Sequence, residues 1–271
     1  MEMRMKITAA ALGICMIAGT PAMVLADEDK PTADLTVAAL SKYVWRGFEL
    51  SQDSVVLQPS MTVGYKGFSA NLWGNLDTDV HDTTSESSNW TETDFTLAYD
   101  KSFGPVGVTV GYIYYGLDSA DDSQEIFVSA SLDTLLSPTL TVYRDYDNYA
   151  GWYATLGISH SFPIKDDISL DLGAQIGYLD VDDASTYGEV INGAQSTTEA
   201  YSALHDGTLS ASVSIPVNEY ISVTPQLTYV FPLSSDASDL MEITSIDANG
   251  QLNNGGDDNY LYGGVSVSMA F

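Results

Sequence analysis

The feature that most constrains this chain is an alternation of apolar and polar residues that recurs along almost its whole length. In residues 168–179, leucine, alanine, isoleucine and tyrosine alternate with serine, aspartate, glycine and glutamine, and residues 209–215 and 265–271 repeat the pattern. A period of two is typical of a β-strand with one apolar and one polar face. Because glycine, serine and β-branched residues are frequent and helix caps are absent, we expect no amphipathic helix.

This alternation predicts twelve strands in one all-β domain. No linker, composition break or clear repeat divides the chain. The strands are predicted at residues 34–48, 54–66, 68–77, 92–102, 106–117, 125–135, 138–146, 151–162, 168–179, 202–215, 220–231 and 259–271.

The first residues have the pattern of a secretory signal peptide. Arg4 and Lys6 precede the apolar run Ile7–Thr20, and small residues follow at a cleavage point after Ala26. The run is too short for a membrane-spanning helix, which needs about 20 apolar residues. We expect residues 1–26 to be removed by Sec-type export and residues 27–271 to form the mature domain.

The composition excludes several classes of protein. The single cysteine, Cys15, lies in the predicted signal peptide, which excludes a disulfide scaffold, a thiolate metal site and a cysteine nucleophile. Removing Arg4, Lys6 and Glu2 from the totals of 9 basic and 37 acidic residues leaves 7 and 36, a net charge of −29. So acidic a chain lacks the basic surface that nucleic-acid binding needs, and 45% hydrophobic residues argue against disorder.

The connections between the predicted strands alternate between tight and long. Even-numbered connections are tight turns such as Lys66-Gly67, and odd-numbered connections are mostly long and polar, although two near Gln52 and Asn148 are short. The long ones are residues 78–91, 118–124, 180–201 and 232–259. Bacterial outer-membrane barrels combine an even strand number with short periplasmic turns and long extracellular loops. The sequence therefore predicts a transmembrane antiparallel β-barrel of about 12 strands, with long acidic extracellular loops, in a Gram-negative outer membrane.

The strand faces and the carboxyl end fit such a barrel. We expect apolar side chains such as Met61 to face lipid and polar ones such as Thr62 to face the lumen. The last strand ends in Phe271, the kind of terminal residue that the barrel assembly machinery recognises, which makes that machinery a predicted partner. Aromatic girdles at the two membrane surfaces are predicted from tyrosines near strand ends, namely Tyr65, Tyr99, Tyr112, Tyr114, Tyr178, Tyr229, Tyr260 and Tyr262.

Most acidic residues lie in or beside the odd-numbered connections, for example Asp118, Asp121, Asp122 and Glu125. A strongly negative rim should concentrate cations and repel anions. The same acids could bind divalent cations that bridge lipopolysaccharide, or serve only as a solvated acidic surface. Small solutes or cations, outer-membrane lipid and lipopolysaccharide are therefore the expected partners.

A motif near the amino end resembles a known family. Residues 41–47 (SKYVWRG), Ser51, 58–60 (QPS), 65–68 (YKGF) and 72–74 (LWG) resemble the TorF-family porins, which are proteobacterial outer-membrane β-barrel proteins. That family carries Tyr-x-Trp-Arg-Gly on the first strand and Trp-Gly on the third. The resemblance implies a barrel and passive transport, and it supplies no substrate.

Arg46 is the most informative residue of this motif. It would share the inward face of the first strand with Lys42, and an arginine in a narrow lumen needs a carboxylate partner such as Asp77, Asp94 or Asp145. Arg46 would then belong either to a charged constriction that selects solutes or to a salt bridge that pins the first strand. Gly47 would leave room for a bulge or a close side chain. The candidate lumen residues are Lys42, Arg46, Asp77, Asp94, Asp145 and Asp171.

We expect no enzyme activity, no cofactor and no metal site. Ser159-His160-Ser161 is the one tight serine–histidine cluster, and His205 and Asp206 lie near the outer rim with Ser202 nearby. Neither group has a recognisable nucleophile, base and orienting residue. His81 and His205 lack the spacing of a metal site.

Three functions remain open at this point. The first is a channel for passive diffusion of small solutes with a preference for cations, and the second is a non-conducting structural or adhesive barrel that acts through its acidic loops. The third is a secreted, soluble β-sandwich that binds carbohydrate through loop aromatics such as Trp90 and Tyr187. Twelve strands lie between the filled and the open barrel sizes, and small neutral lumen residues favour a narrow water-filled pore. A lumen plugged by residues 232–259 is the alternative.

Overall fold

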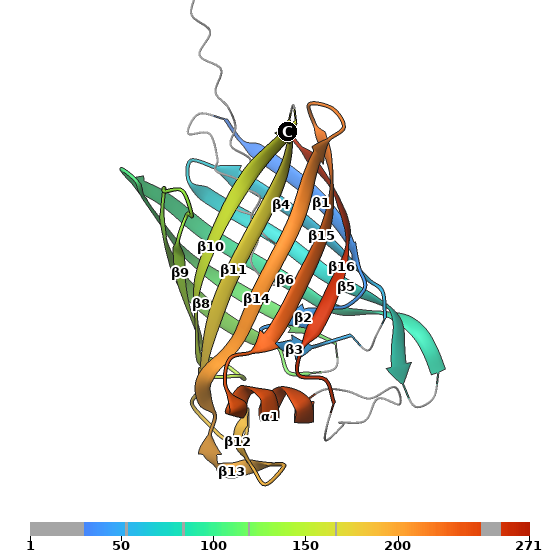
Figure 1. The fold of residues 1–271 in the computed structure, drawn as a ribbon, viewed down its shortest axis with the longest axis vertical. Coiled ribbons are helices and arrows are strands. Elements are labelled where there is room, and N and C mark those ends of the chain that lie inside the picture. Colours follow the sequence, from blue (N-terminus) through green and yellow to red (C-terminus); the bar gives the residue numbers. More distant parts are fainter. Residues whose placement is uncertain (1–29, 52–53, 83–84, 119, 166, 245–255) are drawn as a thin grey trace, which may run out of the picture.

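Twelve antiparallel strands close into a barrel in this computed structural model (Figure 1). The structure describes residues 30–51, 54–82, 85–118, 120–165, 167–244 and 256–271, and the predicted signal peptide lies outside the described residues. The barrel strands are β1 (Thr32–Leu40), β4 (Val56–Tyr65), β5 (Phe68–Asp82), β6 (Ser85–Phe103), β7 (Val106–Leu117), β8 (Ser123–Leu132), β9 (Thr139–Asp145), β10 (Gly151–Lys165), β11 (Ile168–Val181), β14 (Ser202–Pro216), β15 (Ile221–Pro232) and β16 (Tyr260–Ala270). The pairing of β1 with both β4 and β16 closes the wall, which confirms the predicted all-β barrel.

Smaller elements lie in the connections. Two short hairpins consist of β2 (Val44–Trp45) with β3 (Phe48–Glu49) and of β12 (Gly188–Ile191) with β13 (Ala194–Ala200). One α-helix, α1 (Ser235–Thr244), follows β15. Among the described residues, no helix is both long and apolar enough to cross a membrane.

The alternation of the sequence separates the two faces of the wall. Met61 and Val63 are 49% and 47% exposed on the outside, whereas Thr62 between them is only 3% exposed. The outer surface of the described strands is therefore apolar, and their polar face is buried. A soluble β-sandwich would have the opposite arrangement, with the polar face in contact with solvent. The barrel form replaces the sandwich fold considered from sequence.

The two ends of the barrel differ, and we call them the turn end and the loop end. At the turn end, β4 and β5 are joined by Lys66 and Gly67, whose φ angles of 53° and 82° give the two-residue turn that suits a twisted hairpin. Phe271 follows β16 at this end, and its ring stacks on that of Tyr220 at a centroid distance of 6.1 Å. The loop end carries α1, β12 and β13 (Figure 1).

Two predicted strand boundaries are wrong. The strand predicted at residues 34–48 ends at Leu40, so the connection expected to be short near Gln52 is a long one that contains β2 and β3. Residues 78–91, predicted as a loop, belong largely to β5 and β6, which pair as far as Asp82 and Ser85. Their polar composition does not prevent this, because a strand ladder is held by backbone groups.

The prediction that the chain has no amphipathic helix is also wrong, because α1 is one. The hydroxyl of Ser234 accepts a hydrogen bond from the Ala237 N–H at 3.1 Å, which caps the first turn of α1. Ala237, Leu240 and Met241 then follow at helical spacing and are fully buried. Three or four apolar positions are too few to stand out against the strand pattern around them.

The tyrosine girdle is only partly as predicted. Tyr65, Tyr178 and Tyr229 are 38–46% exposed on the outer wall, where an amphipathic ring suits a membrane surface. Tyr260 and Tyr262 are buried inside the barrel, which contradicts their predicted place in the girdle. They face inward because their positions in β16 share the parity of the lumen-facing Ser266.

Candidate functional site

The first segment of the TorF-like motif, residues 41–47, leads into a hairpin that enters the barrel instead of continuing its wall. After Leu40 the chain turns inward, and β2 and β3 pair through Trp45 with Phe48 and Val44 with Glu49. The two residues between the strands, Arg46 and Gly47, have φ angles of 49° and 84°, the conformation of a type I′ hairpin turn. We call residues 42–50 the lumen hairpin.

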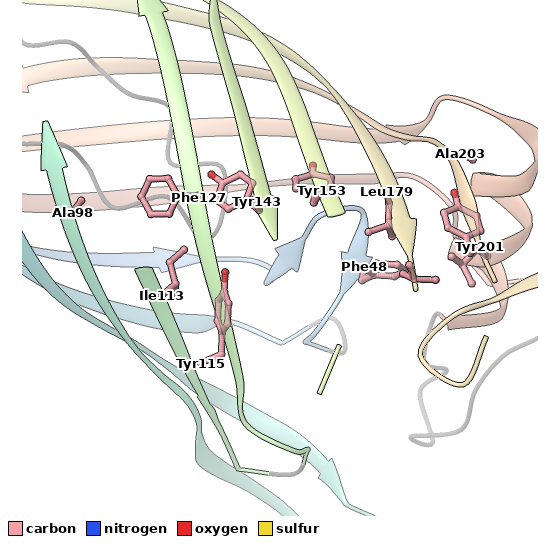
Figure 2. Packing of buried hydrophobic residues seen from close by; sticks show 12 residues of the cluster. Phe48, Ala98, Ile113, Tyr115, Phe127, Tyr143, Tyr153, Leu179, Tyr201 and Ala203 are labelled. Carbon is pink, nitrogen blue, oxygen red and sulfur yellow. The ribbon is translucent and has the colours of Figure 1, made fainter. Parts of the chain in front are cut away.

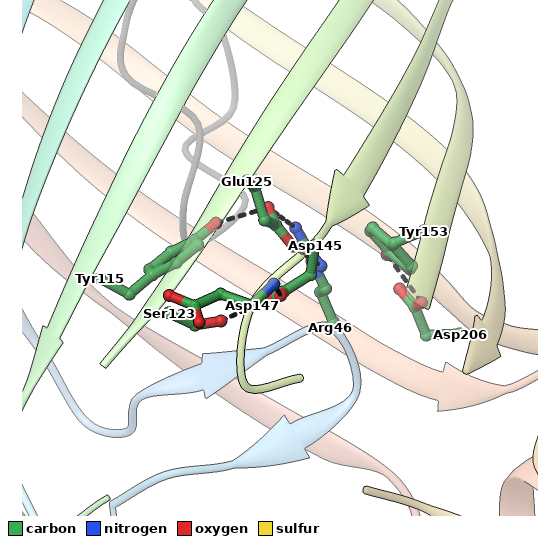
Figure 3. Close-up of polar contacts among 8 residues, drawn as sticks. All are labelled: Arg46, Tyr115, Ser123, Glu125, Asp145, Asp147, Tyr153 and Asp206. Atoms are coloured by element: carbon green, nitrogen blue, oxygen red, sulfur yellow. Dashed lines mark hydrogen bonds and ion pairs between the residues drawn. The ribbon is translucent and has the colours of Figure 1, made fainter. Parts of the chain in front are cut away.

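Arg46, at the tip of the lumen hairpin, reaches the opposite wall. Its two guanidinium nitrogens each donate a hydrogen bond of 2.7 Å to a carboxylate oxygen of Glu125 in β8 (Figure 3). The guanidinium also lies 4.4 Å from the ring centroid of Tyr153 and 4.8 Å from that of Tyr143, in β10 and β9. The same Glu125 accepts a 2.9 Å hydrogen bond from the Tyr115 hydroxyl. A bidentate pair enclosed by aromatic rings holds the hairpin tip across the lumen.

The predicted partners of Arg46 were therefore wrong. Neither Asp77, Asp94 nor Asp145 makes the ion pair, because Arg46 sits on a hairpin tip and not on the wall strand from which those partners were inferred. The sequence predicts Glu125 as the first residue of the strand 125–135, beside an acidic connection, and does not identify it as a lumen residue. Its alternation with Phe127 and Ser129, which also face inward, is the sequence signal that places Glu125 in the lumen.

Aromatic and aliphatic side chains fill the loop-end half of the lumen around this hairpin. Phe48 packs in a buried cluster with side chains from the surrounding strands (Figure 2), among them Ile113, Tyr115, Phe127, Tyr143, Tyr153, Leu179 and Tyr201. A second buried cluster gathers around Tyr43 and Val44. The expectation that small neutral residues leave this part of the lumen open is thus wrong, since rings occupy it.

Helix α1 packs against the lumen hairpin from the loop end. A Cβ atom built on Gly47 would lie 2.3 Å from Cε of Met241 and 3.1 Å from Nε2 of His205, so only glycine fits there without a shift. The prediction that Gly47 makes room for a close side chain is confirmed. Leu240 belongs to the same buried cluster as Phe48. Ser238 of α1 donates a 2.6 Å hydrogen bond to Asp258, which holds the pKa of Asp258 below its usual value.

The other candidate lumen residues all lie inside the barrel. Lys42 forms a 2.6 Å ion pair with Glu49 within the lumen hairpin. Asp77, Asp145 and Asp171 face the lumen and are 4–6% exposed. Each carboxylate accepts a hydrogen bond from a serine: Asp77 from Ser54, Asp145 from Ser123 and Asp171 from Ser169. The six residues are distributed along the lumen and do not form one cluster.

Asp94 differs from these three aspartates in having a second acid beside it. Asp94 and Glu92 both face the lumen from β6, and each is 6% exposed. Their side chains are in hydrogen-bonding contact, and the Tyr43 hydroxyl also bonds to Glu92. Oδ1 of Asp94 is buried without a hydrogen-bond partner. Among the described residues, it is the only buried carboxylate oxygen without a hydrogen-bond partner.

The two serine–histidine groups singled out in the sequence are not assembled into triads among the described residues. His160 uses Nδ1 to contact the Leu135 carbonyl oxygen at 2.6 Å and packs edge-on against Phe162. Ser202 is exposed and bonds to Tyr178, whereas His205 is buried and bonds to Tyr201. In this part of the chain, no group of three or more His, Cys, Asp and Glu side chains could hold a metal ion.

A second arginine–carboxylate pair lies outside the lumen and provides a comparison for Arg46. Arg144 of β9 donates two hydrogen bonds to Asp182, and its guanidinium stacks 5.2 Å from the Trp152 ring centroid. The Asp182 side chain is 43% exposed, and the hydrogen bond from Arg144 holds the pKa of Asp182 below its usual value. The two pairs share a geometry but differ in burial.

Comparison with solved structures finds the same fold in the NanC porin, with a TM-score of 0.54 and 10% identity over 87% of this chain and 98% of that one. LpxR from Salmonella typhimurium aligns with a TM-score of 0.43 and 10% identity, over 89% of this chain and 99% of that one. OmpT of Vibrio cholerae aligns with a TM-score of 0.39 and 6% identity, over 89% and 97%. No protein-family model and no curated protein matches the chain. The chain therefore shares the barrel fold of a porin.

Proposed function

We propose that this protein is an outer-membrane channel that lets small solutes diffuse passively and prefers cations. The exposed apolar wall suits a bilayer, and the closed barrel leaves no unpaired strand edge in it. The likeness of residues 41–74 to TorF-family porins agrees with this assignment, and the fold of the NanC porin is consistent with it. The acidic loops would then face the lipopolysaccharide, and the strand ending at Phe271 would be the one offered to the assembly machinery.

The observation that carries the cation preference is the charge of the lumen. Seven carboxylates are buried in the lumen of the described part of the chain, namely Asp77, Glu92, Asp94, Glu125, Asp145, Asp171 and Asp206. The basic side chains that enter the lumen on the hairpin, Lys42 and Arg46, are each engaged by a carboxylate. A lumen with excess negative charge attracts cations and repels anions.

The lumen hairpin would act as the constriction of this channel. It crosses the loop-end half of the barrel, and Arg46 and Phe48 attach it to the opposite wall and to α1. The same features would suit a plugged, non-conducting barrel whose acidic loops are its working surface. Conductance separates these two functions.

The test is the reversal potential of the refolded mature protein in a planar bilayer with a KCl gradient. We expect current steps with a cation-selective reversal potential. Asp145→Asn together with Asp171→Asn should lower the cation-to-anion permeability ratio by about two-fold or more, because both remove charge from the lumen. Glu199→Gln, an exposed acid on β13, should leave the ratio unchanged. A folded barrel without current would contradict the channel, and an unaltered ratio in the double variant would contradict the lumen as its filter.

A further inference from the structure

The acid pair Glu92 and Asp94 has the features of a cation-binding site. Both side chains project from the same face of β6 into the lumen, and each is more than nine-tenths buried. Asp94 lies opposite Trp73 on one neighbouring strand and opposite Tyr115 on the other. Its Oδ1 has no hydrogen-bond partner, although almost all buried acceptors in proteins have one.

No ion pair joins Glu92 or Asp94 to a basic side chain of the described residues. Arg46 is held by both oxygens of Glu125, and Lys42 is paired with Glu49. The Tyr43 hydroxyl bonds to Glu92 but carries no charge. Two adjacent buried carboxylates are stable only when they share a proton or when a cation lies between them.

We propose that Glu92 and Asp94 bind a hydrated divalent cation, such as Ca²⁺ or Mg²⁺, on its path through the lumen. All the donor atoms are oxygens, which suit these hard cations, and a divalent ion would match the charge of the two carboxylates. Two carboxylates are too few for a tightly held structural metal, so water completes the shell. Weak binding is what a permeation path needs, because an ion must both enter and leave. This inference rests on the proposed channel function.

Calcium titration of the folded mature protein in detergent tests the site without relying on current. Isothermal titration calorimetry would compare the unmodified protein with Asp94→Asn and Glu92→Gln, with heat-modifiable gel migration as the check that each barrel is folded. Asp171→Asn is the matched control, since it neutralises another buried lumen acid, which is hydrogen-bonded to Ser169. The control also leaves the many acids of the loops unchanged.

We expect the unmodified protein and Asp171→Asn to share one saturable calcium site, and both Asp94→Asn and Glu92→Gln to lower its affinity by at least about ten-fold. Identical isotherms for all four proteins would overturn the site and indicate that the two acids share a proton. The current recorded from the same preparations keeps the two proposals apart. Binding without current supports the site and contradicts the channel, whereas current without binding supports the channel and contradicts the site.

Discussion

At the scale of single residues, the ion pair of Arg46 with Glu125 holds the interior of this barrel together. Arginine stays charged in proteins, so a buried guanidinium requires a partner that matches its planar fork. Glu125 supplies both oxygens at 2.7 Å, and the rings of Tyr143 and Tyr153 cover the faces of the guanidinium. The tip of the lumen hairpin is thereby fixed to the wall opposite its origin.

Glu125→Gln removes the charge that compensates Arg46 and leaves a buried cation unpaired. We expect the free energy of unfolding, measured by urea denaturation in detergent, to fall by about 3–5 kcal/mol. Asp182→Asn is the control because it breaks a pair of the same geometry on the exposed outer wall, where solvent screens the charges. Equal losses in the two variants would mean that burial does not determine the strength of the Arg46 pair.

At the scale of elements, the lumen hairpin and α1 are one packed unit, joined where Gly47 meets Met241. Each element alone is short, with two residues in each hairpin strand and ten in the helix. Elements of this size are not stable alone, so their conformation depends on burial against each other and against the barrel wall.

Gly47→Ala tests this contact. Alanine at a φ of 84° costs about 1–2 kcal/mol from the backbone alone, and its Cβ would also overlap Met241, adding about 1–3 kcal/mol. Gly193→Ala is the matched control, since Gly193 has a φ of 77° but no atom within 4 Å of an added Cβ. Urea unfolding should therefore show a larger loss for Gly47→Ala. If the two losses are equal, Gly47 is required only for its backbone conformation and the hairpin does not press on α1.

The elements also show how far the sequence could predict this fold. Alternation located all twelve wall strands, because lipid on one side and lumen on the other impose a period of two on each of them. The hairpin was missed because Tyr43, Val44 and Trp45 are residues that favour strands and follow closely on Leu40, although they do not alternate with polar residues. Arg46 and Gly47 carried the turn signal, but arginine is a rare first residue in a type I′ turn. The pair with Glu125, 79 residues away, depends on barrel closure and has no local signal.

At the scale of the whole molecule, the two halves of the lumen differ. The turn-end half is lined by polar side chains, whereas the lumen hairpin, α1 and buried rings fill the loop-end half. A twelve-stranded barrel is wide enough to admit such a filling and still narrow enough to be constricted by it. The acidic lumen and the constriction together are the basis of the proposed cation-preferring channel. Its function therefore depends on how much of the lumen the hairpin leaves to ions.

The most direct test of this account is the single-channel conductance of the mature protein beside a variant in which residues 43–49 are replaced by glycine and serine. We predict discrete cation-selective steps for the unmodified protein and steps larger by about two-fold or more for the variant, because the constriction has been removed. Replacing the largely exposed residues 192–199 of the β12–β13 hairpin in the same way should leave the steps unchanged. Equal conductance with and without the lumen hairpin, or silent bilayers from barrels that migrate as folded, would contradict the account.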